Sequence, residues 1–203
     1  MKSIDYIKTW LDTKLSAKRY SHSMGAAECA KKLAKLYNLD ENKAYLAGLV
    51  HDCAKNFDND ELIDIINNEI KTGFDASELK NPKTYHAIAG AYIIQKEFDI
   101  DDKEIISAVR NHTIGKVSMS LFDKIIFLAD KIEANQREEK YSKKIWKIIK
   151  KNKGILGLNV ALFKCFSETI KSLVKRKLYI CPTTIEVYNE LQESCAELLE
   201  DED

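Results

Sequence analysis

The chain has few side chains that can bind a metal ion through nitrogen, and one of them is followed directly by an aspartate. The four histidines are His22, His51, His86 and His112, and Asp52 follows His51. The His51-Asp52 pair ends the apolar run 46–50, so both side chains are expected to be largely buried. Burying a charged carboxylate is costly unless a partner compensates it, and a shared cation is a common compensation. The pair therefore predicts a metal site for which the rest of the chain supplies further ligands.

The other candidate ligands also lie in or at the end of segments with helical apolar spacing. His22 falls in the first turns of one expected helix, and His86 begins another. His112 ends an inward-facing stripe, and Asp130 is the last acid of an apolar helix expected over about 121–134. Taken singly, His22 could be a structural hydrogen-bonding residue and Asp130 a solvent-facing acid. Their shared helical placement favours metal binding instead.

Nitrogen and oxygen ligands without a thiolate suit iron, manganese, zinc or another borderline divalent ion. One ion could be held by His22, His51, Asp52 and Asp130. His86 and His112 would then either complete a second site that shares Asp52, or hydrogen-bond a substrate without binding metal. The residues leave both arrangements open, so one or two ions are expected.

The segment that carries the pair has the pattern of a central helix. Apolar residues bury the stretch 41–55 almost all round, and Asp40 is expected to be its N-cap. Neighbouring residues of an ideal α-helix point about 100° apart, so His51 and Asp52 can share one ion only if it sits between their directions. Asp52 could then reach a second ion, or a water, with its other oxygen. Lys55 follows one turn later and projects the same way as His51, although a solvated helix end is the alternative.

The turn after His112 is a candidate phosphate contact. In Thr113–Lys116, a hydroxyl, a glycine amide and an ammonium group come together, although a bland surface turn explains them equally well. The stretch 56–81 has a short expected helix at 61–70 and no pattern that indicates chemistry.

Composition favours an all-α fold. The sequence has two prolines and seven glycines, too few for the turns of a β fold, whereas helix-forming residues dominate. Lys and Arg total 32, as do Asp and Glu, so no overall charge draws the protein to nucleic acid or to a membrane. The five cysteines are odd in number and form no CxxC, which indicates reduced thiols. With no signal-peptide or membrane-span pattern, we expect a soluble, cytoplasmic protein. The oligomeric state is open, a homodimer included.

We expect two parts in the chain. Residues 1–137 form a metal-binding helical core, with 1–17 as a cover helix at its start. Residues 138–203 form C-terminal helices that pack on this core, beginning with a lysine-rich amphipathic stretch.

The order of these motifs resembles a known family. The spacing H…HD…H…H…D over roughly residues 18–137 is similar to that of the HD-domain metal-dependent phosphohydrolases. More closely, five segments resemble the bacterial symmetrical bis(5'-nucleosyl)-tetraphosphatases of that superfamily. They are Gly48–Lys55, Asn111–Thr113, Ser118–Ser120, Lys124–Glu133 and Pro182–Glu186. The bare HD pair is weak evidence, but the ordered set is specific.

The resemblance implies an HD-domain helical bundle with an appended C-terminal helical segment, and cleavage of diadenosine tetraphosphate into two ADP at an iron-containing site. His22, His51, Asp52 and Asp130 match the metal ligands of the family. The positions that match catalytic groups are Asp52, Lys55, His86 and His112. The positions expected to contact the nucleotide polyphosphate are His22, Lys55, His86, His112, Thr113 and Arg137.

One departure concerns the arginine. The family usually continues Ile-Glu with Pro-Asn-Arg, whereas Glu133 is followed here by Ala134-Asn135-Gln136-Arg137. Either Arg137 has taken over by a shift of one residue, or the contact is missing. The alternatives to this activity are an HD phosphohydrolase that acts on a deoxynucleotide or guanosine tetraphosphate, a regulator that binds metal and nucleotide without turnover, and a metal-dependent oxygenase.

Overall fold

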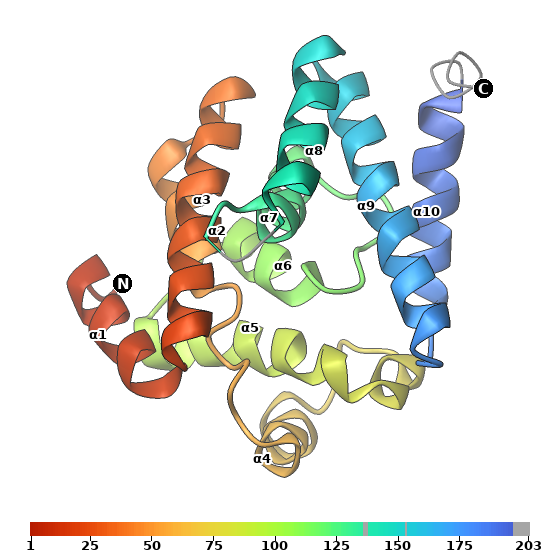
Figure 1. Ribbon diagram of the computed structural model, residues 1–203. Helices are drawn as coiled ribbons and strands as arrows, with labels where there is room; N and C mark the ends of the chain where they lie inside the picture. The colour runs from red at the N-terminus through yellow and green to blue at the C-terminus, as the bar shows by residue number, and fades with distance from the viewer. Residues whose placement is uncertain (136–137, 153, 197–203) are drawn as a thin grey trace.

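The computed structural model describes residues 1–135, 138–152 and 154–196, and every regular element in these ranges is helical (Figure 1). This confirms the all-α prediction. The α-helices are α1 (Ile4–Lys14), α2 (Ala17–Leu36), α3 (Glu41–Val50), α4 (Asn59–Asp64), α5 (Tyr85–Phe98), α6 (Lys103–Asn111), α7 (Leu121–Ile132), α8 (Glu139–Lys151), α9 (Ile155–Lys175) and α10 (Pro182–Ser194). The shorter elements are the π-helix η1 (Ile65–Ile70) and the 3₁₀ helices η2 (Ala76–Lys80) and η3 (Pro82–Thr84).

Helix α2 packs against both α3 and α7, and this trio positions most of the candidate ligands. The contact with α3 is unusually close at Gly48. A Cβ atom there would lie 2.8 Å from the Ala26 carbonyl oxygen and from Cα of Ala27. Only glycine therefore fits, and it lets the end of α3 bring its following residues close to α2.

The N-cap expected at Asp40 is present, and α7, which also leads to a candidate ligand, has a cap of its own. The Asp40 carboxylate accepts hydrogen bonds from the amides of Asn42 at 2.8 Å and Lys43 at 2.9 Å, at the start of α3. Ser120 and Asp123 form a reciprocal capping box at the start of α7. These bonds satisfy amides that a helix leaves unpaired at its N-terminus, so each helix begins where the sequence predicts.

The expectation that α3 runs through residue 55 is wrong. The helix ends at Val50, and the chain continues through turns with amide bonds to the carbonyl three residues back. The side chain of His51 donates from Nδ1 to the Gly48 carbonyl oxygen at 2.7 Å. In a continuing α-helix that carbonyl would accept the amide of Asp52. His51 keeps helical backbone angles as the C-cap residue, and Asp52 lies in the turn that follows the regular helix.

The stretch after this turn also differs from the expected short helix. It divides into α4 and the π-helix η1, and then passes through η2 and η3. The segment of η2 and η3 lies against the turn between α9 and α10, at the lower right of Figure 1. Asn81 donates from Nδ2 to the carbonyl oxygen of Tyr179 at 3.2 Å, which joins the two segments.

Helices α8 to α10 share the hydrophobic core of the preceding helices. Leu158, Leu162 and Phe166 on α9 are fully buried, and the rings of Phe166 and Phe127 stack with centroids 4.4 Å apart. Val187 of α10 belongs to the same core. The boundary at residue 137 stays a prediction, since the core runs continuously across it. All five cysteines are free thiols and buried, as expected.

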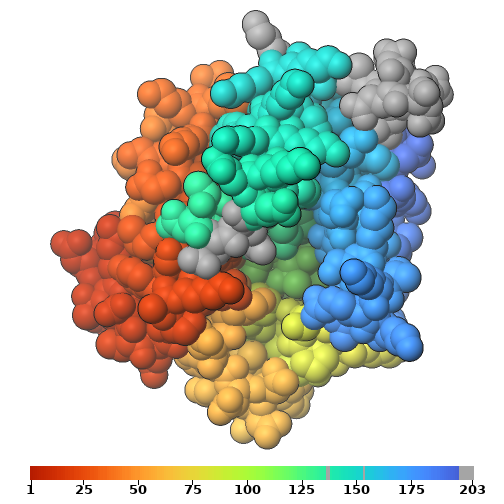
Figure 2. Space-filling model, viewed as in Figure 1, coloured from red at the N-terminus to blue at the C-terminus, as the bar shows by residue number. Residues whose placement is uncertain are grey.

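A recess opens on the face seen in Figure 2, where green atoms from the middle of the chain lie between α2, the orange segment after α3, and α9.

Among the described residues, none of the helices has both the length and the apolar character of a membrane span.

Candidate metal centre and cavity

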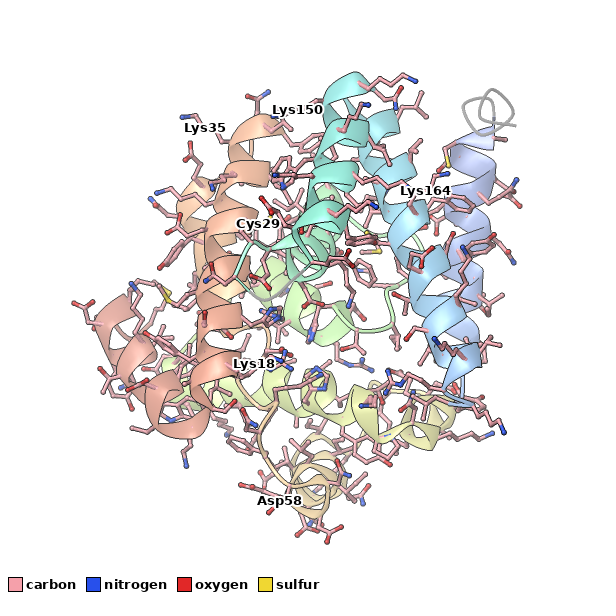
Figure 3. All side chains as sticks on the ribbon, in the orientation of Figure 1. Lys18, Cys29, Lys35, Asp58, Lys150 and Lys164 are labelled. Atoms are coloured by element: carbon pink, nitrogen blue, oxygen red, sulfur yellow. The ribbon has the colours of Figure 1, made fainter. Side chains whose placement is uncertain are left out.

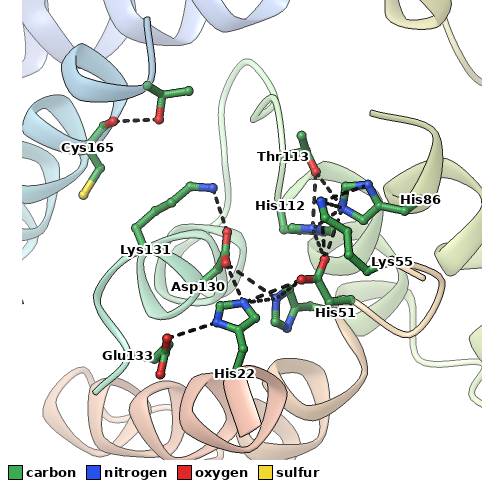
Figure 4. A network of polar contacts seen from close by, with 12 residues as sticks. His22, His51, Lys55, His86, His112, Thr113, Asp130, Lys131, Glu133 and Cys165 are labelled. Atoms are coloured by element: carbon green, nitrogen blue, oxygen red, sulfur yellow. Dashed lines mark hydrogen bonds and ion pairs between the residues drawn. The ribbon is translucent and has the colours of Figure 1, made fainter. Parts of the chain in front are cut away.

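Four imidazoles and two carboxylates converge in the interior (Figure 4). They come from different elements: His22 from the second turn of α2, His51 and Asp52 from the turn after α3, His86 from the first turn of α5, His112 from the C-cap of α6, and Asp130 from the end of α7. All six are at most 5% exposed. The structure thus brings together every candidate metal ligand that the sequence predicts.

The first cluster consists of His22, His51 and Asp130. Nε2 of His22 lies 3.0 Å from Oδ1 of Asp130 and 3.2 Å from Nε2 of His51. Nε2 of His51 lies 3.6 Å from the same aspartate oxygen. One ligand atom from each side chain can therefore face a common point, which is the arrangement that a divalent ion requires.

Asp52 lies between this cluster and the remaining histidines. Its Oδ2 atom is 3.6 Å from Nε2 of His22 and 3.5 Å from Nε2 of His51. Its Oδ1 atom is 3.1 Å from Nε2 of His86 and 3.4 Å from Nε2 of His112. A second group able to hold a metal ion comprises His51, Asp52 and His112. The two oxygens of Asp52 thus point to different sets of imidazoles.

Three of the histidines, His22, His51 and His112, are held so that Nε2 points inward. Nδ1 of His51 donates to the Gly48 carbonyl, and Nδ1 of His112 donates to the Val109 carbonyl, both at 2.7 Å. Nδ1 of His22 lies 3.1 Å from Oε1 of Glu133. A neutral imidazole bound in this way carries its proton on Nδ1 and offers the Nε2 lone pair to a metal, the arrangement found around metal-ligating histidines.

Glu133 is a functional candidate that the sequence patterns did not single out as a site residue. It is fully buried, directly after the end of α7. A Cβ atom at Gly25 would collide with its carboxylate, so the glycine in α2 makes room for it. The available signal was an acid at the end of an apolar helix, which by itself indicates only a helix end.

The site fits a cation in one further respect. Oδ1 of Asp52 is a buried atom for which no described residue provides a hydrogen bond of acceptable angle. The imidazole nitrogens of His86 and His112 lie within 3.4 Å of it but off the direction that a hydrogen bond needs. A buried carboxylate oxygen left in this state is expensive, and a bound metal ion would satisfy it.

Both carboxylates are ionised. Burial alone would raise the pKa of Asp52, but the neighbouring His51 and Lys55 outweigh it and hold that pKa well below its ordinary value. Burial acts on Asp130 in the same direction, and Lys131 is the largest influence that opposes it, so the pKa of Asp130 is also well below normal. The site therefore presents two buried negative charges.

The imidazoles differ from one another. Burial opposes a charge on His51, yet the Asp52 and Asp130 carboxylates outweigh it and raise the pKa of His51 to about 9. Burial and the nearby Lys55 ammonium lower the pKa of His86 to about 3. The His51 imidazole thus carries a positive charge between the two carboxylates, in the place that a bound cation would take. The His86 imidazole is neutral.

Three basic side chains surround the centre. Nζ of Lys55 lies 2.9 Å from Nε2 of His86 and 3.9 Å from Oδ1 of Asp52, so the lysine does face the site. Arg19 pairs with Oδ2 of Asp52 at 2.6 Å, and Lys131 pairs with Asp130 at 2.7 Å. Arg19 and Lys131 were not predicted, because a basic residue on a helix ordinarily faces solvent.

A cavity of about 300 Å³ opens onto this centre. Asp52, Asp130 and His112 line its inner end, and Thr113 lies beside them with its hydroxyl 3.3 Å from Nε2 of His112. The outer end is lined by residues of the segments 77–84 and 169–184. No pattern in 56–81 indicated chemistry, yet Ser77, Glu78 and Asn81 of that stretch line this wall. The predicted contact of Arg137 lies outside the described residues.

Comparisons with known proteins place the chain in a family. A family model described as the HD domain matches residues 19–135. The symmetrical bis(5'-nucleosyl)-tetraphosphatase of Halalkalibacterium halodurans is 37% identical over 180 residues, which cover 87% of this chain and 90% of that protein. The protein of the same name from Bacillus subtilis is 33% identical over 175 residues, covering 86% and 90% respectively.

A solved structure extends the likeness to the fold. It is the crystal structure of a Clostridium acetobutylicum protein described as a "predicted HD superfamily hydrolase involved in NAD metabolism". The likeness has a TM-score of 0.86 at 37% identity, and it covers 95% of this chain and 98% of the other. The ordered histidines and aspartates, the helical fold and the matches over most of the chain lead to one conclusion: this chain belongs to the HD-domain hydrolase family and is similar to its symmetrical bis(5'-nucleosyl)-tetraphosphatases.

Proposed function

We propose that this protein hydrolyses diadenosine tetraphosphate symmetrically, to two molecules of ADP. The observation that carries the proposal is the position of Asp52, whose two oxygens face two sets of buried imidazoles at the inner end of a cavity with cations on its walls. The similarity to relatives named for this activity, over about nine tenths of their length, supports the choice of substrate.

His22, His51, Asp52 and Asp130 would hold one divalent ion. His86, His112 and the other oxygen of Asp52 would complete a second site. We take iron as the ion because the resemblance to the symmetrical tetraphosphatases implies it, and manganese, zinc or another divalent metal also suits imidazole and carboxylate ligands. A divalent ion held in this way supplies a water of lowered pKa and polarises a phosphoryl oxygen.

The remaining side chains act on the substrate. Lys55 and Thr113 line the cavity beside the candidate ligands, so they can contact phosphate oxygens there. Arg19 and Lys131 add two positive charges to the same end. Stabilising negative charge as it develops is the largest task in phosphoryl transfer, and fixed cations in a partly buried site perform it well. If His86 and His112 hold no second ion, they can hydrogen-bond the phosphoryl oxygens instead.

The reaction balances with water alone. The water oxygen bonds to one of the two central phosphorus atoms, and the bridging bond between the central phosphates breaks. The leaving ADP departs with the bridging oxygen, and the water protons pass to solvent or to a product phosphate.

Product analysis tests the proposal. Purified protein loaded with iron or manganese is incubated with diadenosine tetraphosphate, and the nucleotides are separated by ion-exchange chromatography. ADP as the only product is expected, and Asp52→Ala should give none. ATP with AMP would contradict symmetrical cleavage. ADP binding without turnover would indicate a nucleotide-binding regulator, and preferential hydrolysis of a deoxynucleotide or guanosine tetraphosphate would indicate another HD phosphohydrolase.

A further inference from the structure

A second cavity, of about 390 Å³, adjoins the one that opens onto the metal centre. The two cavities share three lining residues, Lys55, Asn81 and Lys83. The first contains the carboxylates Asp52 and Asp130, whereas the second contains the imidazole of His86 and no carboxylate. The two spaces thus lie on either side of a common wall of basic and amide side chains.

The lining of the second cavity has the chemistry of a nucleobase site. Its apolar members are Phe57, Leu62, Pro82 and Leu178. Asn59 lines the same cavity and offers an amide to the edge of a base. Apolar walls with an aromatic ring and a few polar groups are typical of sites that bind a base by stacking and apolar contact.

The common wall is built to meet phosphates. Asn81 is buried and holds the wall in place, because Oδ1 accepts the amide of Lys83 at 3.1 Å and Nδ2 donates to the Tyr179 carbonyl at 3.2 Å. No described residue forms an ion pair or hydrogen bond with the Lys83 ammonium, whereas Lys55 is directed to His86. An exposed ammonium at the junction of two cavities is available to an anion that crosses between them.

The first cavity is too small to enclose the whole of the proposed substrate. At about 300 Å³ it lies at the small end of the range for ligand sites, so it cannot enclose two nucleosides together with four phosphates. A substrate with a nucleoside at each end, cleaved in its middle, needs a place for each half on either side of the metal centre.

We propose that the cavity lined by Phe57, Leu62, Pro82 and Leu178 binds one nucleoside of a dinucleoside polyphosphate, with Lys83 holding the phosphates that pass from it to the metal centre. This inference rests on the proposed function, since it assigns a place to one half of that substrate. The other nucleotide half occupies the first cavity. Each chain thus binds two ADP molecules as products.

The first test fills the second cavity. Leu178→Trp places an indole in it, and Val174→Trp adds the same group at a site on α9 that is 62% exposed and lines neither cavity. Calorimetric titration of the metal-loaded protein with ADP should give two molecules per chain for the wild type and for Val174→Trp. Leu178→Trp should bind one. The KM for diadenosine tetraphosphate should rise about tenfold or more in that variant, with kcat changed far less.

The second test removes the charge at the common wall. Lys83→Ala should raise the KM for diadenosine tetraphosphate about tenfold and weaken one of the two ADP sites. Lys35 is an exposed lysine at the far end of α2 (Figure 3). Lys35→Ala should leave both the KM and the binding of ADP unchanged. Circular dichroism melting of each variant checks that the fold is retained.

The outcomes separate this inference from the proposed function. One ADP per wild-type chain, or two in Leu178→Trp together with an unchanged KM in Lys83→Ala, overturns the nucleoside site even if diadenosine tetraphosphate is hydrolysed symmetrically. Absence of hydrolysis by the wild type overturns the proposed function, and the ADP titration then still decides whether the second cavity binds a nucleotide.

Discussion

The Nε2 atom of His22 lies 3.0 Å from Oδ1 of Asp130, although the two residues belong to α2 and α7. The contact exists because α2 packs against α7, and because Glu133, directly after α7, holds the other nitrogen of the same imidazole. The end of α7 thus supplies both a candidate ligand and the group that orients its partner.

Removing either carboxylate should empty the centre. Asp52→Ala and Asp130→Ala each delete a negatively charged candidate ligand, so both variants should lose bound metal together with activity. Lys55→Ala should retain metal while losing activity, because its ammonium faces the substrate side. Elemental analysis of the purified variants measures the metal content, with Asp60→Ala, an exposed acid on α4, as control. Full metal content in both aspartate variants would place the ion elsewhere.

Glu133 should act on metal affinity through His22. Glu133→Gln keeps the size of the side chain but removes the charge that favours a proton on Nδ1 of His22. Loss of such a supporting contact typically weakens metal binding by about 10- to 100-fold. Competition with a chelator of known affinity measures the change. An unchanged affinity in a folded variant would show that Glu133 serves only packing.

Bound metal should stabilise the fold. The centre contains two buried carboxylates, and Oδ1 of Asp52 accepts no hydrogen bond from a described residue, so an ion that binds there favours the folded state. At a free concentration of 100 times Kd, the linkage contributes about 2.7 kcal/mol. Treatment with a chelator should therefore lower Tm, and re-addition of metal should restore it. A Tm that shifts as much in Asp52→Ala as in the wild type would contradict binding at this centre.

Two glycines of helices α3 and α5 should respond in opposite ways to alanine. At Gly48 a Cβ atom would lie 2.8 Å from backbone atoms of α2, so Gly48→Ala should destabilise the fold by about 1–3 kcal/mol. At Gly90 the nearest atom, Sγ of Cys53, is 3.6 Å away. Gly90→Ala should be neutral or stabilising by up to about 1 kcal/mol, because alanine favours a helix. Urea unfolding measures both. Equal midpoints would refute the close approach of α2 and α3.

The ligands were predictable from the sequence because their signal is local. Each candidate histidine or aspartate lies in or next to an apolar helical stripe, and such a stripe faces the core wherever the helix packs. The caps at Asp40 and Ser120 were predictable for the same reason, since each bonds within its own first turn. That these residues meet at one centre was expected from their ligand types and from the resemblance to the HD-domain family.

The rest depends on contacts between distant segments. The end of α3 at Val50 follows from a side-chain bond of His51 that competes with the helix, and no periodicity reports such a bond. The outer cavity wall arises where Asn81 meets Tyr179, and neither residue stands in a recognisable motif. The role of Glu133 depends on Gly25, because only a residue without a Cβ atom leaves room for the Glu133 carboxylate. Local patterns therefore gave the candidate ligands but not the groups that orient them or the binding walls.

The most direct measurement of the central claim is the fate of the water oxygen. Metal-loaded protein is incubated with diadenosine tetraphosphate in water enriched in oxygen-18, and the nucleotides are analysed by mass spectrometry. Symmetrical attack of a water held at the Asp52 centre predicts ADP alone, with half of the molecules carrying one heavy oxygen on the terminal phosphate and none on the inner phosphate. AMP and ATP as products, or label on the phosphate next to adenosine, would contradict it.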